Sequence, residues 1–161
     1  MLNFHSSKNI PMNEQPLNFI FKVRDTILSN PEILNIADEP KYFYDSLDNS
    51  QIKDIQPPIL WYLVIVEKNN PSVRYDLSFC FGKITLPLLK DFVENTKDYR
   101  RADGDNKHIP VVVAEDISPV LPEIIKLNKK EGLIALSMEL VSVRDLTTLR
   151  FTRFPSRYTA W

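Results

Sequence analysis

Residues 59 to 82 read ILWYLVIVEKNNPSVRYDLSFCFG, and this stretch decides the class of fold. Its first part, Ile59 to Glu67, carries β-branched and aromatic residues on both faces, which predicts a strand with cover on both sides. The turn-forming residues KNNPS follow, and apolar and polar residues then alternate, which predicts a partner strand and a hairpin. The alternation places Val73, Tyr75, Leu77, Phe79 and Phe81 on one face and Arg74, Asp76, Ser78 and Cys80 on the other.

Two helices are predicted on either side of this hairpin. Between residues 16 and 28, apolar residues recur at spacings of three and four, and Asn30-Pro31 ends the helix. After the hairpin, Thr85 is a favourable N-cap for a helix that carries one apolar stripe as far as residue 99. Both segments are therefore expected to pack on the sheet.

The last third of the chain predicts another helix and a second hairpin. Ser118-Pro119 opens the helix, and Gly132 stands at its expected end. Residues 133 to 144 and 149 to 154 then form two extended segments around a turn. A short candidate strand, IPVVV, precedes the helix.

The order of these elements predicts an α+β fold, in which a mainly antiparallel sheet of about four strands in two hairpins packs with about three helices. We expect a single domain over residues 15 to 154. An extended N-terminal arm at residues 1 to 14 and an arginine and aromatic tail at residues 155 to 161 would flank it. The connection at residues 31 to 58 is rich in proline and predicts a surface segment with one short helical turn.

Composition restricts the class of protein. The chain has 161 residues, of which 43% are hydrophobic and 25% charged, as is typical of a globular domain. Its formal net charge of −1 argues against a general nucleic-acid binder, because only a local basic patch could then hold the phosphates. The longest apolar run has the length of a strand, so no membrane contact is expected. The first fifteen residues lack the pattern of a secretory signal.

No pattern in the sequence is typical of catalysis or of metal binding. Cys80 lies within a strand, where a buried structural thiol is favoured, and only His5 and His108 could activate it. Residues 103 to 106 resemble the start of a calcium loop, but Ala114 stands where the closing glutamate belongs. We therefore predict a non-enzymatic protein without catalytic, metal-binding or cofactor-binding residues. An enzyme would need an acid–base constellation that only folding assembles.

The C-terminal stretch LRFTRFPSRYTAW alternates arginines with aromatic rings. Such residues are enriched in the cores of protein interfaces, and they also stack on unpaired bases. Completion of the last strand is an equally good account of Phe151 and Phe154. The interface candidates are Arg153, Phe154, Arg157, Tyr158 and Trp161, together with Phe4 and Ile10 in the N-terminal arm.

Several motifs follow one another along the chain: a helix at residues 17 to 28, the run KYFYDS, a proline pair before ILWYLVIV, the partner strand RYDLSFCFG, a helix, and a terminal arginine and aromatic strand. In this order they resemble the tail terminator and neck-ring (head-tail completion) proteins of tailed bacteriophages. The resemblance implies a structural subunit of the virion, a tail terminator or head-tail connector, that is assembled in the host cytoplasm. It also implies a homo-oligomeric ring, neighbouring virion proteins such as the portal, adaptor or tail tube, and passing contact with DNA in the lumen.

The alternative hypothesis is a small cytoplasmic binding module. Such a module would recognise single-stranded nucleic acid or a protein partner through its C-terminal tail. Removal of residues 155 to 161 would distinguish the two hypotheses, because a ring subunit would lose assembly and a module would lose salt-sensitive oligonucleotide binding.

Overall fold

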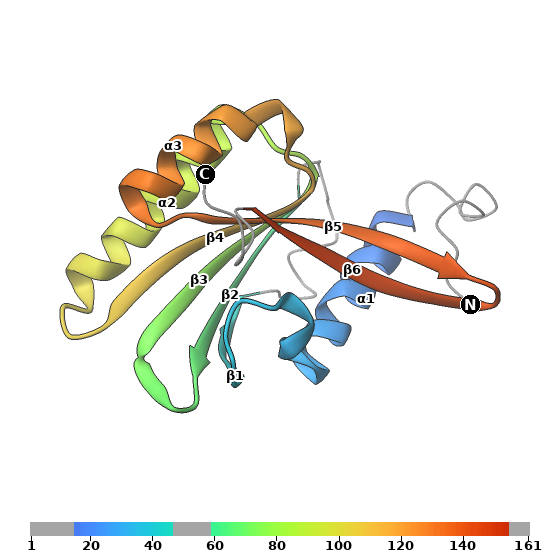
Figure 1. Ribbon diagram of the computed structural model, residues 1–161, viewed down its shortest axis with the longest axis horizontal. Helices are drawn as coiled ribbons and strands as arrows, with labels where there is room; N and C mark the ends of the chain where they lie inside the picture. Colours follow the sequence, from blue (N-terminus) through green and yellow to red (C-terminus); the bar gives the residue numbers. More distant parts are fainter. Residues whose placement is uncertain (1–14, 47–58, 155–161) are drawn as a thin grey trace.

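The computed structural model describes residues 15 to 46 and 59 to 154. In these residues, six strands form one mixed sheet in the order β1-β2-β3-β4-β5-β6 (Figure 1). The strands are β1 (Pro40–Asp45), β2 (Ile59–Glu67), β3 (Asn70–Lys83), β4 (Lys107–Asp116), β5 (Ile134–Val143) and β6 (Leu146–Phe154). The helices are α1 (Gln15–Ser29), α2 (Leu86–Ala102) and α3 (Leu121–Glu131), with short 3-10 helices at Pro31–Leu34 and Ser118–Val120.

The sheet combines antiparallel ends with a parallel centre. Strands β1, β2 and β3 form an antiparallel meander, and β5 pairs with β6 in the same way. Strand β4 lies between them and is parallel to both β3 and β5. Parallel neighbours need a crossover connection, which α2 and α3 provide on either side of β4 in the chain.

The helices cover both faces of the sheet. Figure 1 shows α2 and α3 together on one face and α1 on the other. Ile20 and Val23 of α1 join Trp61 and Leu77 in one buried cluster. Leu89 of α2 joins a second cluster, which includes Cys80, Val112, Ile124 and Ala135. The predicted alternation along β3 is thereby confirmed, because its aromatic residues belong to the first cluster and Cys80 to the second.

Local signals in the sequence set the ends of the helices. Helix α1 stops at Ser29, directly before Asn30-Pro31. At the start of α2, the Leu88 amide donates to Oγ1 of Thr85 over 3.4 Å, so the predicted N-cap is confirmed. Gly132 ends α3 with a φ of 73°, a left-handed conformation that favours glycine. None of the helices in the described residues is long and apolar enough to cross a bilayer.

The predicted fold class is wrong. The sequence predicts a mainly antiparallel sheet of about four strands, whereas the described residues form a mixed sheet of six. The candidate strand IPVVV is the middle of β4, whose Val111, Val112 and Val113 are buried on both faces, as is usual for a parallel strand. Strand β1 lies in the segment at residues 31 to 58, whose prolines predict a surface connection. The two predicted hairpins do form, but they are joined through β4.

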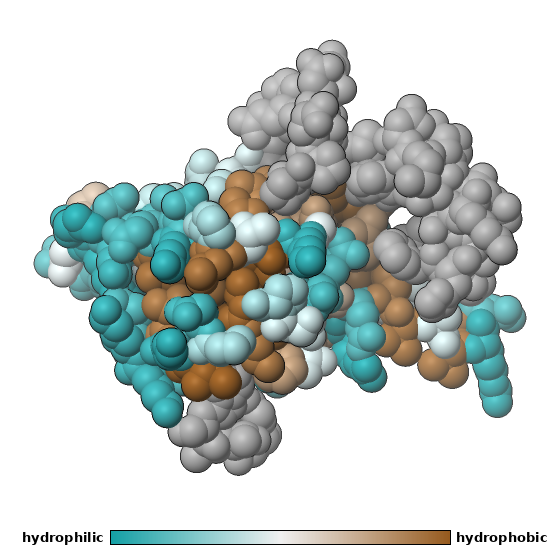
Figure 2. All heavy atoms as spheres, turned by 90° about the horizontal axis from the view of Figure 1, so that it is seen from above, coloured by the Kyte–Doolittle hydropathy of each residue, from teal (hydrophilic) through white to brown (hydrophobic). Residues whose placement is uncertain are grey.

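The face that carries α2 and α3 has a mixed surface. Figure 2, a view from above Figure 1, shows hydrophobic residues gathered in its middle with hydrophilic residues around them.

Candidate functional site

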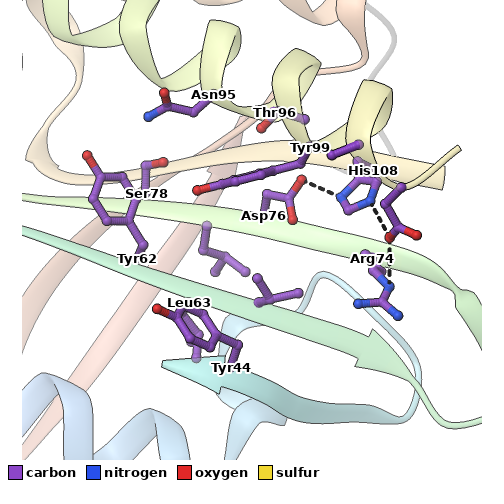
Figure 3. A pocket seen from close by; sticks show the side chains of 14 residues that line it. Tyr44, Tyr62, Leu63, Arg74, Asp76, Ser78, Asn95, Thr96, Tyr99 and His108 are labelled. Atoms are coloured by element: carbon purple, nitrogen blue, oxygen red, sulfur yellow. Dashed lines mark hydrogen bonds and ion pairs between the residues drawn. The ribbon is translucent and has the colours of Figure 1, made fainter. Parts of the chain in front are cut away.

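A pocket of about 370 Å³ lies between the sheet and α2 (Figure 3). This volume is within the range of pockets that bind small molecules or parts of larger ligands. Residues from β1, β2, β3, α2 and β4 line it, so that only the folded sheet creates it. Its polar and aromatic lining includes Tyr44, Tyr62, Arg74, Asp76, Tyr99 and His108.

The alternation of β3 positions the polar side chains of the pocket. Arg74, Asp76 and Ser78 all point to the face covered by α2, because residues two apart share a face of a strand. On the neighbouring parallel strand, His108 is the register partner of Arg74. Tyr62 of β2 is the register partner of Ser78. Three strands thus contribute side chains to one face of the sheet.

His108 links two carboxylates. Its Nδ1 lies 2.8 Å from Oδ2 of Asp76, and its Nε2 lies 3.0 Å from Oδ2 of Asp103. Arg74 continues the chain of charges, with Nε 3.6 Å from the same Asp103 oxygen. Arg100 holds the backbone of His108, because its Nε and Nη2 donate to the His108 carbonyl over 3.0 and 2.9 Å. The imidazole is therefore fixed from both sides.

The two contacts of His108 limit where the protons of the site can lie. A neutral imidazole donates from one nitrogen only, so two carboxylate contacts require a second proton, either on the ring or on a carboxyl group. Burial raises the pKa of Asp76, although the charge and hydrogen bond of His108 oppose the shift. Hydrogen bonds from Asn106 and then from His108 lower the pKa of Asp103. The two carboxyl groups that contact the imidazole thus differ, because the pKa of Asp76 is raised and that of Asp103 is lowered.

The other oxygen of Asp76, Oδ1, is buried and has no hydrogen-bond partner among the residues that the structure describes. The whole residue is only 5% exposed. An unpaired polar atom that is buried in this way costs free energy, roughly 1–3 kcal/mol in general. Oδ1 of Asp76 is therefore a buried acceptor that no described residue satisfies.

Three tyrosines give the pocket its aromatic character. Tyr44 is 55% exposed and Tyr99 46% exposed, so ring surface remains open to a ligand at both. Tyr62 is half-buried, and its ring stands edge-on against Phe92 at an interplanar angle of 83°. Burial raises the pKa of Tyr62 and of Tyr99, so both keep their hydroxyl protons at neutral pH. Figure 3 shows the Tyr99 ring beside the Asp76 carboxylate.

The sequence did not predict this site. His108 was considered only as a partner for Cys80, but Cys80 lies in the buried cluster under α2 and α3 and its Sγ is 3.8 Å from the Lys83 carbonyl. Asp103 drew attention only as part of an incomplete calcium-loop pattern. One local signal was present, namely that Asp76 shares the polar face of the predicted strand with Arg74 and Ser78. No three His, Cys, Asp or Glu side chains in residues 15–46 and 59–154 are grouped so as to hold a metal.

Two of the predicted interface residues lie in the described chain. Arg153 is partly buried, and its Nη1 donates to the Asn35 carbonyl over 3.4 Å. Phe154 is also partly buried and packs against the cluster under α2 and α3. Their proposed contacts with another subunit stay a prediction. The remaining candidates lie outside the described residues: Phe4, Ile10, Arg157, Tyr158 and Trp161.

Comparisons with known proteins give one structural likeness. No family model matches the chain, and no curated protein matches it. A solved structure of EndoMS in its apo form is similar, with a TM-score of 0.49, 14% sequence identity and coverage of 76% of this chain and 47% of that chain. The chain thus spans about half of the length of that structure. A likeness of this degree does not extend to function.

The hypothesis of a phage neck or tail ring subunit is wrong. It rested on an order of motifs within a mainly antiparallel sheet, whereas the described strands form a mixed sheet with a parallel centre. The alternative hypothesis of a binding module accounts better for a chain with a preformed pocket.

Proposed function

We propose that the protein is a non-enzymatic binding module that takes one unpaired base of a single-stranded nucleic acid into the pocket between the sheet and α2. The observation that carries this proposal is the combination of exposed tyrosine rings with a buried, unpaired acceptor in one pocket. Aromatic side chains stack on unpaired bases, and polar groups beside them read the edge of the base.

The size of the pocket favours a flat ring over a small cation. Tyrosine rings with a carboxylate also suit an alkylammonium group, which would lie against the ring faces. Such a head group would fill only a small part of a pocket of about 370 Å³. A base, with its sugar at the opening, uses both the ring faces and the buried part of the pocket, where Asp76 lies.

Basic side chains lie in β3, at the C-terminal end of α2 and at the start of β4. Arg74 lines the pocket, and Arg101 directly precedes the lining residue Ala102. Lys107 is exposed and precedes His108 at the start of β4. Nearby carboxylates pair with two of these cations: Arg74 with Asp103, and Arg101 with Asp98. This arrangement supports a few phosphate contacts and a modest dependence on salt.

Binding without catalysis is supported by the state of His108. A general base needs a ring nitrogen that can accept a proton from the substrate. Both nitrogens of His108 instead face carboxylates, over 2.8 and 3.0 Å. The imidazole therefore acts as a linker that orients Asp76. The C-terminal tail at residues 155 to 161, which the sequence suggested as the contact with nucleic acid, lies outside the described residues.

The test is fluorescence anisotropy of the full chain with labelled short DNA and RNA strands, each single-stranded and as a duplex of the same sequence. We expect the single strands to bind more tightly than the duplexes, because a paired and stacked base cannot enter the pocket. Tyr99→Ala should weaken single-strand binding roughly tenfold, the usual scale of one lost stacking contact. Leu146→Ala is the matched control, since this exposed residue lies in the β5–β6 hairpin, away from the pocket.

Three results would contradict the proposal. The first is a folded wild-type protein that binds no strand. The second is equal loss of affinity in the Tyr99 and Leu146 variants. The third is displacement of the strand by low concentrations of tetramethylammonium, which would assign the tyrosines to a cage for a cation.

A further inference from the structure

We infer that the pocket selects bases that carry an exocyclic amino group, namely cytosine, adenine and guanine, over uracil and thymine, and that Oδ1 of Asp76 is the selecting atom. The inference rests on the proposed function and adds the chemical class of base to it.

Oδ1 is an acceptor in either protonation state of the site. When Asp76 is ionised, both of its oxygens accept hydrogen bonds. When Asp76 is protonated, the proton lies on Oδ2, because that oxygen is 2.8 Å from Nδ1 of His108 and would donate to it. Oδ1 is then the carbonyl oxygen of the acid. The pocket therefore presents the same acceptor whichever group carries the proton.

No described residue of the protein donates a hydrogen bond to this acceptor. The hydroxyls of Tyr62, Ser78, Thr96 and Tyr99 all belong to residues that line the pocket. None of them donates to Oδ1, which has no partner among the described residues. Burial of this unpaired oxygen lowers the stability of the fold, and no contact within the described residues compensates for it. Such a group is typical of a site that binds a ligand.

The acceptor is also held in place. Oδ2 of Asp76 is tied to His108, whose backbone carbonyl accepts from Nε and Nη2 of Arg100 over 3.0 and 2.9 Å. Arg100 reaches further to Glu131 at the end of α3, with Nη1 3.4 Å from Oε2. A carboxylate fixed by two neighbouring elements cannot turn away from a mismatched base. Selectivity requires such rigidity, because a mobile group would avoid an unfavourable contact.

Base chemistry supplies the discrimination. Cytosine, adenine and guanine present an amino group that donates, whereas uracil and thymine present a carbonyl oxygen at the position that corresponds to the cytosine amine. Two acceptors that face each other in a buried site repel, and neither gains the hydrogen bond it had in water. Cytosine and uracil have the same size and stack alike. A comparison of the two bases therefore isolates the effect of the hydrogen-bonding edge.

The experiment compares strands that differ only in cytosine or uracil, by anisotropy with the full chain. We expect the wild type to bind the cytosine strand roughly tenfold more tightly. In Asp76→Asn, the amide oxygen can keep the contact with His108 while the amide nitrogen replaces Oδ1 as a donor. The preference should then reverse in favour of uracil. Asp105→Asn is the matched control: it removes the same charge from the exposed turn before β4 and should leave the ratio of the two affinities unchanged.

A second measurement needs no mutation. A strand with N4,N4-dimethylcytosine keeps the ring but has no amino hydrogen, and the wild type should bind it as weakly as the uracil strand. Equal wild-type affinity for cytosine, uracil and dimethylcytosine strands would overturn the inference and leave the proposed function standing. Absence of binding to every strand by folded protein would overturn the proposed function itself. An unchanged cytosine preference in folded Asp76→Asn would also overturn the inference.

Discussion

Oδ2 of Asp76 lies 2.8 Å from Nδ1 of His108, although 32 positions separate the two residues in the chain. The contact exists because β3 and β4 are parallel and pair Arg74 with His108, while α2 makes the crossover between them. The same crossover places Tyr99 over the carboxylate (Figure 3). This one crossover thus brings Asp76, His108 and Tyr99 together in the pocket.

The stability of the protein should depend on pH through Asp76. Burial raises the pKa of this group above its usual 3.8, so the folded state holds the proton more tightly than the unfolded state. Its stabilising contribution is complete below the unfolded pKa and is lost as pH rises through the folded pKa. The free energy of unfolding of the wild type, relative to Asp76→Asn, should therefore fall as pH rises from about 3.5. Urea unfolding of both proteins across the acidic range measures this.

Asp105→Asn serves as the control for this pH series, because Asp105 is exposed. The difference in free energy of unfolding between Asp105→Asn and the wild type should change less with pH than the difference between Asp76→Asn and the wild type. A wild type that gains stability over Asp76→Asn as pH rises would show that the ionised carboxylate is the stabilised form.

Arg100 should contribute far more to stability than its neighbour Arg101. Two nitrogens of Arg100 donate to the His108 carbonyl over 3.0 and 2.9 Å, and its side chain also reaches Glu131. Loss of hydrogen bonds from a charged group costs roughly 1.5–3 kcal/mol, so Arg100→Ala should lower the free energy of unfolding by about this amount. The Arg101 side chain is 67% exposed, and Arg101→Ala should change stability by less than about 0.5 kcal/mol. Equal effects in urea unfolding would exclude a special role for Arg100.

Asp45 should stabilise the edge of the sheet through Trp61. Its Oδ1 accepts from Nε1 of Trp61, and its Oδ2 accepts from Nε and Nη2 of Arg24 over 3.0 and 2.7 Å. Because Trp61 is fully buried, Asp45→Ala leaves its N–H without this acceptor and should cost roughly 1–3 kcal/mol. Asp45→Asn keeps an acceptor and should cost less.

The Asp45 variants are best measured by tryptophan fluorescence in a Trp161→Phe background, since the chain has two tryptophans. Trp61 then reports alone on unfolding. Identical midpoints for Asp45→Ala and the parent protein would show that the indole N–H finds another acceptor.

Cys80 should be unreactive in the folded protein. Burial, with a smaller effect of the Glu115 charge, raises the pKa of its thiol to about 11, and only the thiolate is a nucleophile. A thiol reagent at about pH 8 should therefore modify the folded chain very slowly and the urea-unfolded chain rapidly. The measurement is the modification rate at several urea concentrations. Rapid labelling without urea would contradict the buried position of Cys80.

Much of the local structure could be predicted from the sequence. The end of α1 at Asn30-Pro31, the N-cap Thr85 and the left-handed Gly132 are each set by a few neighbouring residues. The faces of β3 follow from alternation alone, because successive side chains of a strand point in opposite directions. These signals act over a few residues and therefore appear directly in the sequence.

Some strands and their order could not be predicted. The pairing of β1 with β2 shifts register between Tyr42 and Tyr44. The strand also begins with a proline, Pro40, in a segment that is rich in proline. Strand β4 was recognised only in part, because its polar ends hide its length. Its parallel place between β3 and β5 depends on the crossovers of α2 and α3, which no local pattern records.

The sequence by itself thus determined the helices, their caps, the two hairpins and the buried nature of Cys80. Only the tertiary structure brought Asp76, His108 and Asp103 together, because their contacts depend on the parallel register of β3 and β4. Propensity and periodicity act between neighbours in the chain, whereas a pocket depends on distances between segments that are far apart in it. For that reason the sequence of this protein determines its elements, and the pairing of its central strands decides what it can bind.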